Sequence, residues 1–396
     1  MKHGQFNAVS VFSGAGGFDL GVEAAGFNTR LCIDLDYHSC RTLRLNRRKG
    51  RDSGIHRFLQ SAVVYQNDIT RVSGPKLLRA ARLKPGEVDL VYGGPPCQSF
   101  SVFGKRRGLE DPRGQLLLEY IRVIRELRPT AFIFENVAGL LSIGDGSVFE
   151  EFLEEIALNE QGQPEYTVSH YLLDTARYGV PQYRSRLIVF GSRSGVKVSK
   201  PPETHTPSYD FNVLDSDLCP TPTVGEVLQN MPEPFTDALP NHVGRQHSDR
   251  IIERYQSLRY GERDSKTRIN KLHPERPSFT IIVGSDKGGG KGHVHPWDPR
   301  EVTPRESARL QTFPDFWEFS GTSRHPIRQV GNAVPPVFGG VIASHVMREV
   351  FGVVNAPTYS EIVSRLQLDY LESVYQLGST GETEQEAADT VSVIQS

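Results

Sequence analysis

The stretch from residue 9 to residue 34 constrains the fold more than any other part of the sequence. Val9–Phe12 predicts a short strand, Ser13–Gly17 (SGAGG) a glycine turn, and residues 18–25 a helix that ends at Gly26. The next apolar segment, 31–33, predicts a strand that ends at Asp34, 20 residues after Gly14. Strand, glycine turn, helix and strand in this order are typical of a doubly wound α/β fold, in which ligands bind beyond the carboxyl ends of the strands.

The residues around this turn indicate the kind of ligand. A dinucleotide fingerprint starting at Gly14 requires glycine at position 19, where the sequence has Asp19. Asp34 suits a ribose diol, and Asp68, which follows a predicted strand at 63–65, can accept from an adenine amino group. Two acids and a glycine turn favour a nucleoside with little phosphate, such as S-adenosylmethionine. For Asp68 alone, a carboxylate that caps a helix is a reasonable alternative.

A second loop carries a lone thiol. Residues 93–101 read GGPPCQSFS and follow the apolar run 88–92 directly. The prolines fix φ and the glycines allow a close turn, so the loop directs Cys97 from the end of a strand. We interpret Cys97 as a candidate nucleophile. The alternative is a buried structural cysteine, which does not require this lead-in.

Composition excludes several classes of protein. The four cysteines of the 396-residue chain form no C-x-x-C pair, so neither a disulfide framework nor a zinc site is indicated. His293 and His295 alone make a weak metal site, and we predict no metal. Residues 1–12 lack a signal-peptide core, and no apolar run approaches the ~18 residues that span a bilayer. We expect a cytoplasmic protein that does not contact a membrane.

Six sequence blocks then occur in a diagnostic order. They are Phe12–Phe18 (FSGAGGF), Pro95–Gln98 (PPCQ), Phe134–Val137 (FENV), Gln182–Arg186 (QYRSR), Arg309–Pro314 (RLQTFP) and Gln329–Pro336 (QVGNAVPP). Over roughly residues 8–348 the chain resembles the DNA cytosine-5 methyltransferases, in their bacterial restriction-modification form. The resemblance implies a Rossmann-like, mostly parallel sheet with helices on both faces, and a smaller irregular target-recognition domain.

The resemblance also implies S-adenosyl-L-methionine as the cofactor. Phe12 would stack on the adenine, Asp34 would hold the ribose, and Asp68 with Ile69 would line the adenine pocket. Asn332 and Ala333 would close around the methionine part. The remaining cofactor residues that we predict are Gly14, Gly16, Gly17 and Pro95.

The chemistry explains the predicted catalytic residues. Cytosine C5 is a poor nucleophile until a group adds to C6, and a thiolate such as Cys97 adds reversibly. Glu135 would hydrogen-bond or protonate N3 and accept from the N4 amino group. Arg186, together with Arg184, would contact the base O2 or the surroundings of the thiol. For Arg184, pairing with a surface acid is an equal alternative.

A stacked duplex hides C6, so the target base must be flipped out. Residues 101–108 (SVFGKRRG) follow the nucleophile and suit a loop that closes over phosphates. The DNA-contacting residues that we predict are Gln98, Ser101, Lys105, Arg106 and Arg107. A second basic run, residues 41–57, has seven bases and one acid, and a solvated helix face is its more ordinary interpretation.

We predict five segments. A catalytic domain (1–195) is followed by a target-recognition domain with a hinge (196–325), a return segment that completes the catalytic domain (326–356), an extra helix (357–377) and a disordered acidic tail (378–396). The second segment is rich in proline, and residues 245–276 hold nine Lys or Arg against five acids. The glycine-rich residues 284–293 either approach DNA or form a connector. The extra helix either docks on the core or pairs with a second protomer. We expect a monomer, and a dimer through residues 360–377 is the alternative.

The predicted function is methyl transfer to C5 of a flipped cytosine in a specific duplex DNA sequence, through a covalent bond between Cys97 and C6. The partners would be double-stranded DNA and, as a genetic partner only, a cognate restriction endonuclease. A tRNA cytosine-5 methyltransferase with the same catalytic residues and a catalytically silent DNA-binding relative are the alternatives. A zinc cytidine deaminase is excluded, because its P-C-x-x-C motif would require cysteine where the sequence has Phe100.

Overall fold

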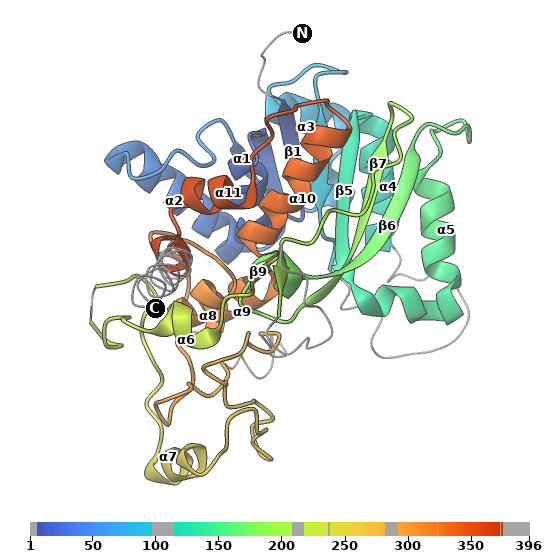
Figure 1. The fold of residues 1–396 in the computed structure, drawn as a ribbon. Helices are drawn as coiled ribbons and strands as arrows, with labels where there is room; N and C mark the ends of the chain where they lie inside the picture. Colours follow the sequence, from blue (N-terminus) through green and yellow to red (C-terminus); the bar gives the residue numbers. More distant parts are fainter. Residues whose placement is uncertain are drawn as a thin grey trace, which may run out of the picture.

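A seven-stranded sheet forms the centre of the computed structural model, which describes residues 6–96, 115–207, 218–236, 238–281, 292–322, 324–372 and 374 (Figure 1). The strands are β1 (Asn7–Val11), β2 (Asn28–Asp34), β3 (Val63–Gln66), β4 (Leu90–Gly93), β5 (Ala131–Val137), β6 (Thr167–Asp174) and β7 (Ser185–Ser192). Their order across the sheet is β3-β2-β1-β4-β5-β7-β6. β1 to β5 are parallel, and β7 lies antiparallel between β5 and β6.

The strand order reverses next to β1. The chain passes from β1 outward to β2 and β3, and then returns to β4 on the other side of β1. The loops that leave the carboxyl ends of the neighbouring strands β1 and β4 therefore run in opposite directions across the sheet. Ligands of doubly wound sheets bind in the crevice at such a point.

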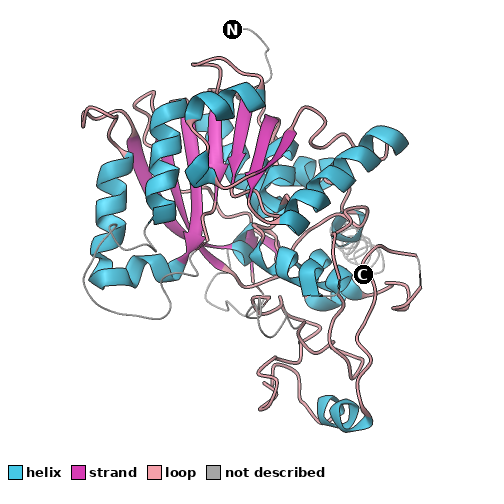
Figure 2. Ribbon diagram, turned by 180° about the vertical axis from the view of Figure 1, so that it is seen from behind, coloured by secondary structure: helices cyan, strands magenta, loops and turns pink. Residues whose placement is uncertain are grey.

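Alternate residues of the strands face two hydrophobic clusters. On β5, Phe132 and Phe134 join one cluster, whereas Ala131 and Ile133 join the other. The first cluster includes α3 (Gly74–Ala81), α4 (Gln115–Leu127) and α5 (Ser147–Ile156). The second includes α1 (Gly17–Ala24), α2 (Tyr37–Ser53) and α10 (Pro336–Glu349). Figure 2 shows the sheet between helices on both sides, so the predicted mostly parallel α/β fold is confirmed.

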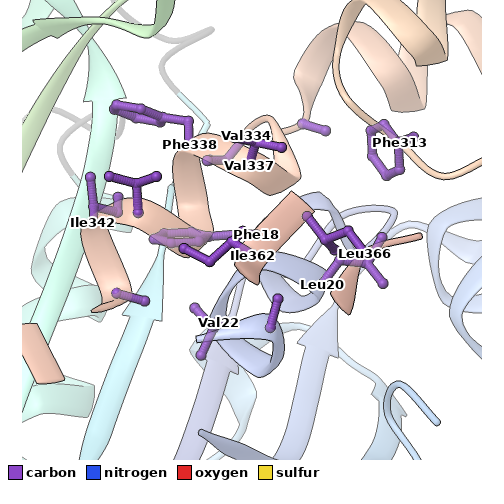
Figure 3. Packing of buried hydrophobic residues seen from close by; sticks show 14 of the residues in the cluster. Phe18, Leu20, Val22, Phe313, Val334, Val337, Phe338, Ile342, Ile362 and Leu366 are labelled. Carbon is purple, nitrogen blue, oxygen red and sulfur yellow. The ribbon is translucent and has the colours of Figure 1, made fainter. Parts of the chain in front are cut away.

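Helix α10 comes from the far end of the chain and packs on α1. A β-carbon on Gly21 would collide with the carbonyl oxygen of Pro336 and the backbone nitrogen of Gly340, so the two helices meet backbone to backbone. Only glycine permits this approach. Figure 3 shows the apolar side chains around this contact, among them Phe18 of α1 and Phe338 of α10.

Two further helices precede α10. They are α8 (Pro304–Leu310) and α9 (Arg324–Asn332). By length and composition alone, the segment Arg324–Glu349 would suit a membrane crossing, with a mean hydropathy of 1.2 in its most apolar window, and 89% of that window is buried inside the protein. Such burial is that of a core helix.

The region between β7 and α8 has few regular elements among its described residues. They are β8 (His205–Thr206), β9 (Cys219–Pro220), α6 (Val224–Leu228) and α7 (Asp249–Gln256). Tyr255, Ile269 and Val294 form a small hydrophobic cluster of their own. Figure 1 shows α7 at the end of this region that is farthest from the sheet.

The segment after α10 folds back onto the core. Helix α11 (Tyr359–Arg365) is followed by Gln367, whose φ of 57° separates it from a further helical turn at 369–372. Five apolar residues of this segment are buried in the cluster that contains α1 and α10: Ile362, Val363, Leu366, Leu368 and Leu371. The predicted tail, residues 378–396, lies outside the described residues.

Candidate active site

The turn between β1 and α1 has a strained backbone. Phe12 adopts a φ of 55°, and Gly14 and Gly16 adopt φ values of 55° and 93°. A phenylalanine with positive φ is rare, and such strain persists where the surrounding structure imposes it, often at ligand sites. Gly16 is the N-cap of α1, so the turn leads into the first helical turn, whose backbone N–H groups have no carbonyl partner within the helix.

Asp34, at the end of β2, lies beside this turn. Its Oδ2 accepts a hydrogen bond from the backbone N–H of Gly14 at 2.7 Å, and its Oδ1 accepts from the N–H of Asp36 at 2.8 Å. Burial raises the pKa of Asp34, and these hydrogen bonds oppose that shift. The next side chain, Leu35, is 68% exposed. A carboxylate next to an exposed apolar side chain suits a ligand that has both hydroxyl groups and an aromatic ring.

Asp68 and Ile69 follow β3. The Asp68 carboxylate caps the short 3-10 helix η1 (Ile69–Arg71), accepting from the N–H of Thr70 at 3.0 Å. Ile69 is buried under the same edge of the sheet. Asp68 therefore has the capping contact that the sequence allowed as an alternative, and it also lines the cavity described next.

A cavity of about 1530 Å³ lies at the carboxyl edge of the sheet. Its lining includes most of the predicted cofactor residues: Phe12, Gly14, Gly17, Asp34, Asp68, Ile69, Pro95, Asn332 and Ala333. It also includes Glu135, Arg184 and Arg186. Gly16 is not part of the lining, because its α-carbon faces Leu43 and Trp317. The volume exceeds the roughly 300–1,000 Å³ of a typical small-molecule pocket, which leaves room for a nucleoside and a second ring.

Glu135 and Arg186 form an ion pair within this cavity. In the antiparallel register Arg186 of β7 lies opposite Val137 of β5, two residues beyond Glu135. The Arg186 Nε donates to Glu135 Oε1 at 2.8 Å, and both side chains are only 11% exposed. Since a carboxylate paired in this way is fixed in position, the second oxygen of Glu135 has a defined place relative to the cavity.

The proline loop approaches this pair closely. A β-carbon on Gly94 would lie 2.5 Å from Glu135 Oε2, so glycine is needed there. The Asn136 side-chain amide donates to the carbonyl oxygen of Pro95 at 3.2 Å and anchors the start of the loop. The described chain then stops at Pro96 and resumes at Gln115. Six predicted residues lie outside the described residues: Cys97, Gln98, Ser101, Lys105, Arg106 and Arg107.

Arg184 contacts the segment that returns from the far end of the chain. Its Nη2 donates to the carbonyl oxygens of Gly331 at 2.9 Å and Ala333 at 3.1 Å. Burial, and to a smaller extent Arg186, lowers the pKa of Arg184 to about 9. Within the described part of the chain its buried Nε has no hydrogen-bond partner. Arg184 thus joins the Glu135 side of the cavity to the side that holds Asn332.

The histidines of the second region have protein partners. The Nε2 of His293 lies 3.1 Å from the carbonyl oxygen of Thr280, and burial lowers the pKa of His293 to about 4. His295 lies beside Asp298 at 3.3 Å and Glu306 at 3.7 Å. Among the residues that the structure describes, no group of three or more His, Cys, Asp or Glu side chains is arranged to hold a metal ion.

The basic run 41–57 forms most of α2 and the loop after it. Its exposed bases are Arg41, Arg44, Arg48, Lys49, Arg51 and Arg57. Lys49 pairs with Glu318, and Arg51 pairs with Asp52 at 3.1 Å. The structure gives no contact that favours DNA over solvent for this face.

Three contributors to the site escaped the sequence reasoning. Leu35 is an apolar residue directly after the strand-end acid, and that position was a usable signal. Trp317, which is fully buried, donates from Nε1 to the carbonyl oxygen of Ala15 at 3.0 Å, across 302 residues of sequence. Asn136 was quoted within a motif, but its bond to Pro95 follows only from the folded sheet.

The described residues fit an S-adenosylmethionine-type cofactor. The open space at the Gly14 α-carbon, where a β-carbon would meet no atom within 4 Å, leaves the turn accessible to a ligand. Asp34 supplies a carboxylate beside it, and Phe12 and Leu35 supply apolar surface. This set combines hydroxyl recognition with ring stacking and does not depend on a phosphate-binding glycine pattern.

A family model described as C-5 cytosine-specific DNA methylase matches residues 6–348. The match covers most of the chain and includes every element that lines the cavity. The chain belongs to the C-5 cytosine-specific DNA methylase family. The predicted family and the predicted class of enzyme are confirmed.

Several type II methyltransferases are similar to the methylase. M.AquIA of Picosynechococcus sp. is 39% identical over 251 residues, which cover 61% of the methylase and 96% of the relative. M1.HphI of Haemophilus parahaemolyticus is 32% identical over 358 residues, 86% of each chain. M.XorII of Xanthomonas oryzae pv. oryzae is 31% identical over 373 residues, 86% of the methylase and 84% of the relative.

Solved structures share the fold of the methylase. A putative DNA modification methyltransferase encoded within an E. coli prophage has a TM-score of 0.67 at 24% identity and covers 88% of the methylase and 100% of its own chain. Dnmt2 of S. pombe has a TM-score of 0.58 at 15% identity, with coverage of 89% and 100%. At these identities the likeness concerns the fold alone.

Proposed function

We propose that the methylase transfers a methyl group from S-adenosyl-L-methionine to C5 of a cytosine that is flipped out of a specific duplex DNA sequence. The observation that supports this most is that the Glu135–Arg186 pair and the glycine turn open onto one cavity. One side of the cavity suits a nucleoside cofactor, and the other suits a polar base edge. Methyl transfer requires both to be present together, close to each other and shielded from water.

On this proposal Phe12, Gly14, Gly17, Asp34, Asp68 and Ile69 hold the adenosine part of the cofactor, and Pro95, Asn332 and Ala333 lie around the rest. When bound, S-adenosyl-L-methionine supplies an electrophilic methyl group on its sulfonium. Arg184 keeps the carbonyl groups of Gly331 and Ala333 in place, so the methionine side of the pocket depends on it.

Cys97 is the proposed nucleophile. Its thiolate forms a bond to C6 of the cytosine, and the electron pair of the C5–C6 double bond becomes available at C5. Glu135, protonated on one oxygen, donates to N3 and accepts from the N4 amino group, and so stabilises the negative charge that develops on the ring. Arg186 holds Glu135 and faces the base. C5 would take the methyl group as the bond between the methyl carbon and the sulfonium sulfur breaks, which leaves S-adenosyl-L-homocysteine. A base then removes the C5 proton, the C5–C6 double bond forms again, and Cys97 leaves as the thiolate.

Access to the base requires that it leave the helix, at an unstacking cost of a few kcal/mol. The loop that includes Ser101 and residues 105–107, together with Gln98, would bind the opened duplex. The irregular region between β7 and α8 would read base edges in the major groove. We also propose that the methylase protects host DNA beside a cognate restriction endonuclease, because its relatives are type II methyltransferases. We further propose that it is a monomer of the bacterial cytoplasm.

Nucleoside mass spectrometry tests the proposal. Unmethylated genomic DNA and tRNA are incubated in parallel with the methylase and S-adenosyl-L-methionine, and Cys97→Ala serves as the control. 5-Methylcytosine in DNA that disappears with Cys97→Ala would support both the reaction and the nucleophile, and sequencing of that DNA would give the target site. 5-Methylcytosine in tRNA alone would mean that the substrate is tRNA and not DNA. If 5-methylcytosine is absent from tRNA and from genomic DNA of several base compositions, a catalytically silent DNA-binding protein would be favoured.

A further inference from the structure

The segment after α10 contacts several distant parts of the methylase. Residues 357–372 lie beyond the residues 6–348 that match the family. The Arg365 guanidinium donates to the carbonyl oxygen of Ala24, at the end of α1, at 3.0 Å. The Gln367 amide donates to the carbonyl oxygen of Ile55 at 3.0 Å. Figure 3 shows Ile362 and Leu366 beside α1, so this docking segment (357–372) is part of the core.

Tyr370 fixes the far end of the docking segment. Its hydroxyl donates to the carbonyl oxygen of Phe313 at 3.0 Å and lies 3.4 Å from that of Arg309. The Arg309 guanidinium lies 4.9 Å from the centre of the Tyr370 ring. Asp315 holds the same guanidinium, with an Nη2–Oδ2 distance of 2.6 Å. Tyr370 therefore holds the chain at Arg309 and Phe313, four residues before Trp317.

That stretch of chain supports the glycine turn from behind. Trp317 Nε1 donates to the carbonyl oxygen of Ala15 at 3.0 Å. A β-carbon on Gly16 would lie 2.9 Å from the Trp317 ring, and one on Gly17 would lie 2.9 Å from the Phe313 ring. Both aromatic side chains are fully buried. Since interiors are close-packed, a shift of Phe313 or Trp317 displaces the turn.

We propose that Tyr370 is a positioning residue for the cofactor turn: it holds Phe313 and Trp317, and these hold Ala15, Gly16 and Gly17 in the conformation that binds the cofactor. The proposal rests on the proposed use of S-adenosyl-L-methionine. It assigns a part in cofactor binding to a segment outside the family match, in addition to the stability that its apolar residues provide.

Tyr359 offers a matched control within the same segment. Its hydroxyl donates to the carbonyl oxygen of Gly179 at 3.2 Å, and its ring occupies the space where a β-carbon on Gly179 would be, 2.5 Å from Cζ. Gly179 follows the 3-10 helix η4 (Thr175–Tyr178), between β6 and β7, and belongs to another part of the chain than the glycine turn. Tyr370→Phe and Tyr359→Phe each remove one hydroxyl from the docking segment and keep the ring.

The test measures cofactor binding and backbone protection in the full-length protein. Calorimetry with S-adenosyl-L-homocysteine should give a dissociation constant about three- to tenfold higher for Tyr370→Phe, the effect of one buried hydrogen bond. Amide hydrogen exchange of residues 12–18 without ligand should become faster in the same variant. In assays with saturating DNA, KM for S-adenosyl-L-methionine should rise with little change in kcat. Tyr359→Phe should leave all three quantities close to wild type, although both variants lower the unfolding temperature.

The outcomes separate the two proposals. Wild-type protein that binds S-adenosyl-L-homocysteine, with the same affinity in Tyr370→Phe, would overturn the positioning role alone. Equal losses of affinity in Tyr370→Phe and Tyr359→Phe would also overturn it, because both would then reflect general destabilisation. Wild-type protein that binds no S-adenosyl-L-homocysteine would overturn the proposed cofactor, and the role of Tyr370 with it.

Discussion

At the scale of single residues, the Glu135–Arg186 pair serves the proposed reaction and also contributes to the stability of the fold. Both side chains are 11% exposed, and their charges compensate each other at 2.8 Å. Breaking such a pair on one side leaves a charge with little water around it, which costs more than the pair itself contributes. A carboxylate that must bind a base edge is therefore also needed for the folded state.

The first prediction concerns Glu135→Gln. We expect the rate of methylation to fall about 10²- to 10⁴-fold, because the variant loses a positioned acid that can exchange a proton with N3. Binding of S-adenosyl-L-homocysteine should stay within about twofold of wild type, since Glu135 makes no proposed cofactor contact. Single-turnover kinetics with saturating DNA measures the rate.

Glu165→Gln is the matched control for this change. Glu165 is also an acid with only 7% of its side chain exposed, and it pairs at 2.8 Å with Arg128, whose side chain is 62% exposed, before the start of β6. It does not line the cavity among the described residues. Equal losses of activity in the two variants would mean that Glu135 acts through stability and not through the reaction.

The second prediction concerns Glu23 of α1. Burial, followed by the charge of Asp19, raises the pKa of Glu23 from 4.5 to about 8. The folded state therefore retains a proton that the unfolded state loses above pH 4.5, so this group lowers stability as the pH rises from about 4.5 to about 8. Glu23→Gln should match wild type near pH 5 and exceed its stability near pH 8.5. Urea unfolding across this range measures the difference, and two parallel curves would contradict the prediction.

At the scale of elements, the contact between α1 and α10 sets two effects against each other. Helix propensity alone favours alanine over glycine by about 1 kcal/mol inside a helix. At Gly21 the added β-carbon would meet the backbone of Pro336 and Gly340, and backbone atoms cannot move aside as a flexible side chain can. Packing therefore decides the sign.

The third prediction follows from this contact. Gly21→Ala should destabilise the protein by about 1–3 kcal/mol, the usual cost of inserting a methyl group into a packed core. Gly244→Ala is the control, because its β-carbon would make only an ordinary contact, 3.4 Å from Phe235. Denaturant unfolding of both variants provides the comparison. A gain in stability for Gly21→Ala would show that the helices separate to admit the methyl group.

The elements also show how far sequence reasoning extends. The strands at 9–12, 31–33 and 63–65 were predictable, because short apolar runs between turn residues carry a local signal. Glu135 and Arg186 were predictable from motifs, but their ion pair depends on the antiparallel register of β5 and β7. The bonds from Arg184 to Gly331 and Ala333 join residues more than 140 positions apart, and no local pattern encodes them. The extra helix predicted at 357–377 is interrupted at Gln367, which adopts a φ of 57°.

At the scale of the whole molecule, the docking segment (357–372) closes the side of the core formed by α1 and α10. Its five buried apolar residues each contribute roughly 1.5–3 kcal/mol when fully buried. Their burial within one chain leaves this apolar surface covered without a second protomer. The described part of the segment docks on the core, and a monomer remains the prediction for the oligomeric state.

The fourth prediction concerns removal of residues 357–396. The truncated protein should unfold at a clearly lower temperature, because the apolar faces of α1 and α10 become exposed. Light scattering should give a monomer for the full-length protein, since the segment is used internally. Unchanged thermal stability after truncation, or a full-length dimer that the truncation dissociates, would contradict this account.

The pairing of α1 with α10 has a consequence for synthesis on the ribosome. Translation adds about 5–20 residues per second, so roughly 15–65 s separate the emergence of α1 from that of its partner. During this interval the nascent chain holds the glycine turn, and later also Cys97 and Glu135, without the helix that packs against α1. Chains released early by ribosome stalling therefore lack a finished cofactor pocket, and methylation begins only with molecules whose translation has reached α10.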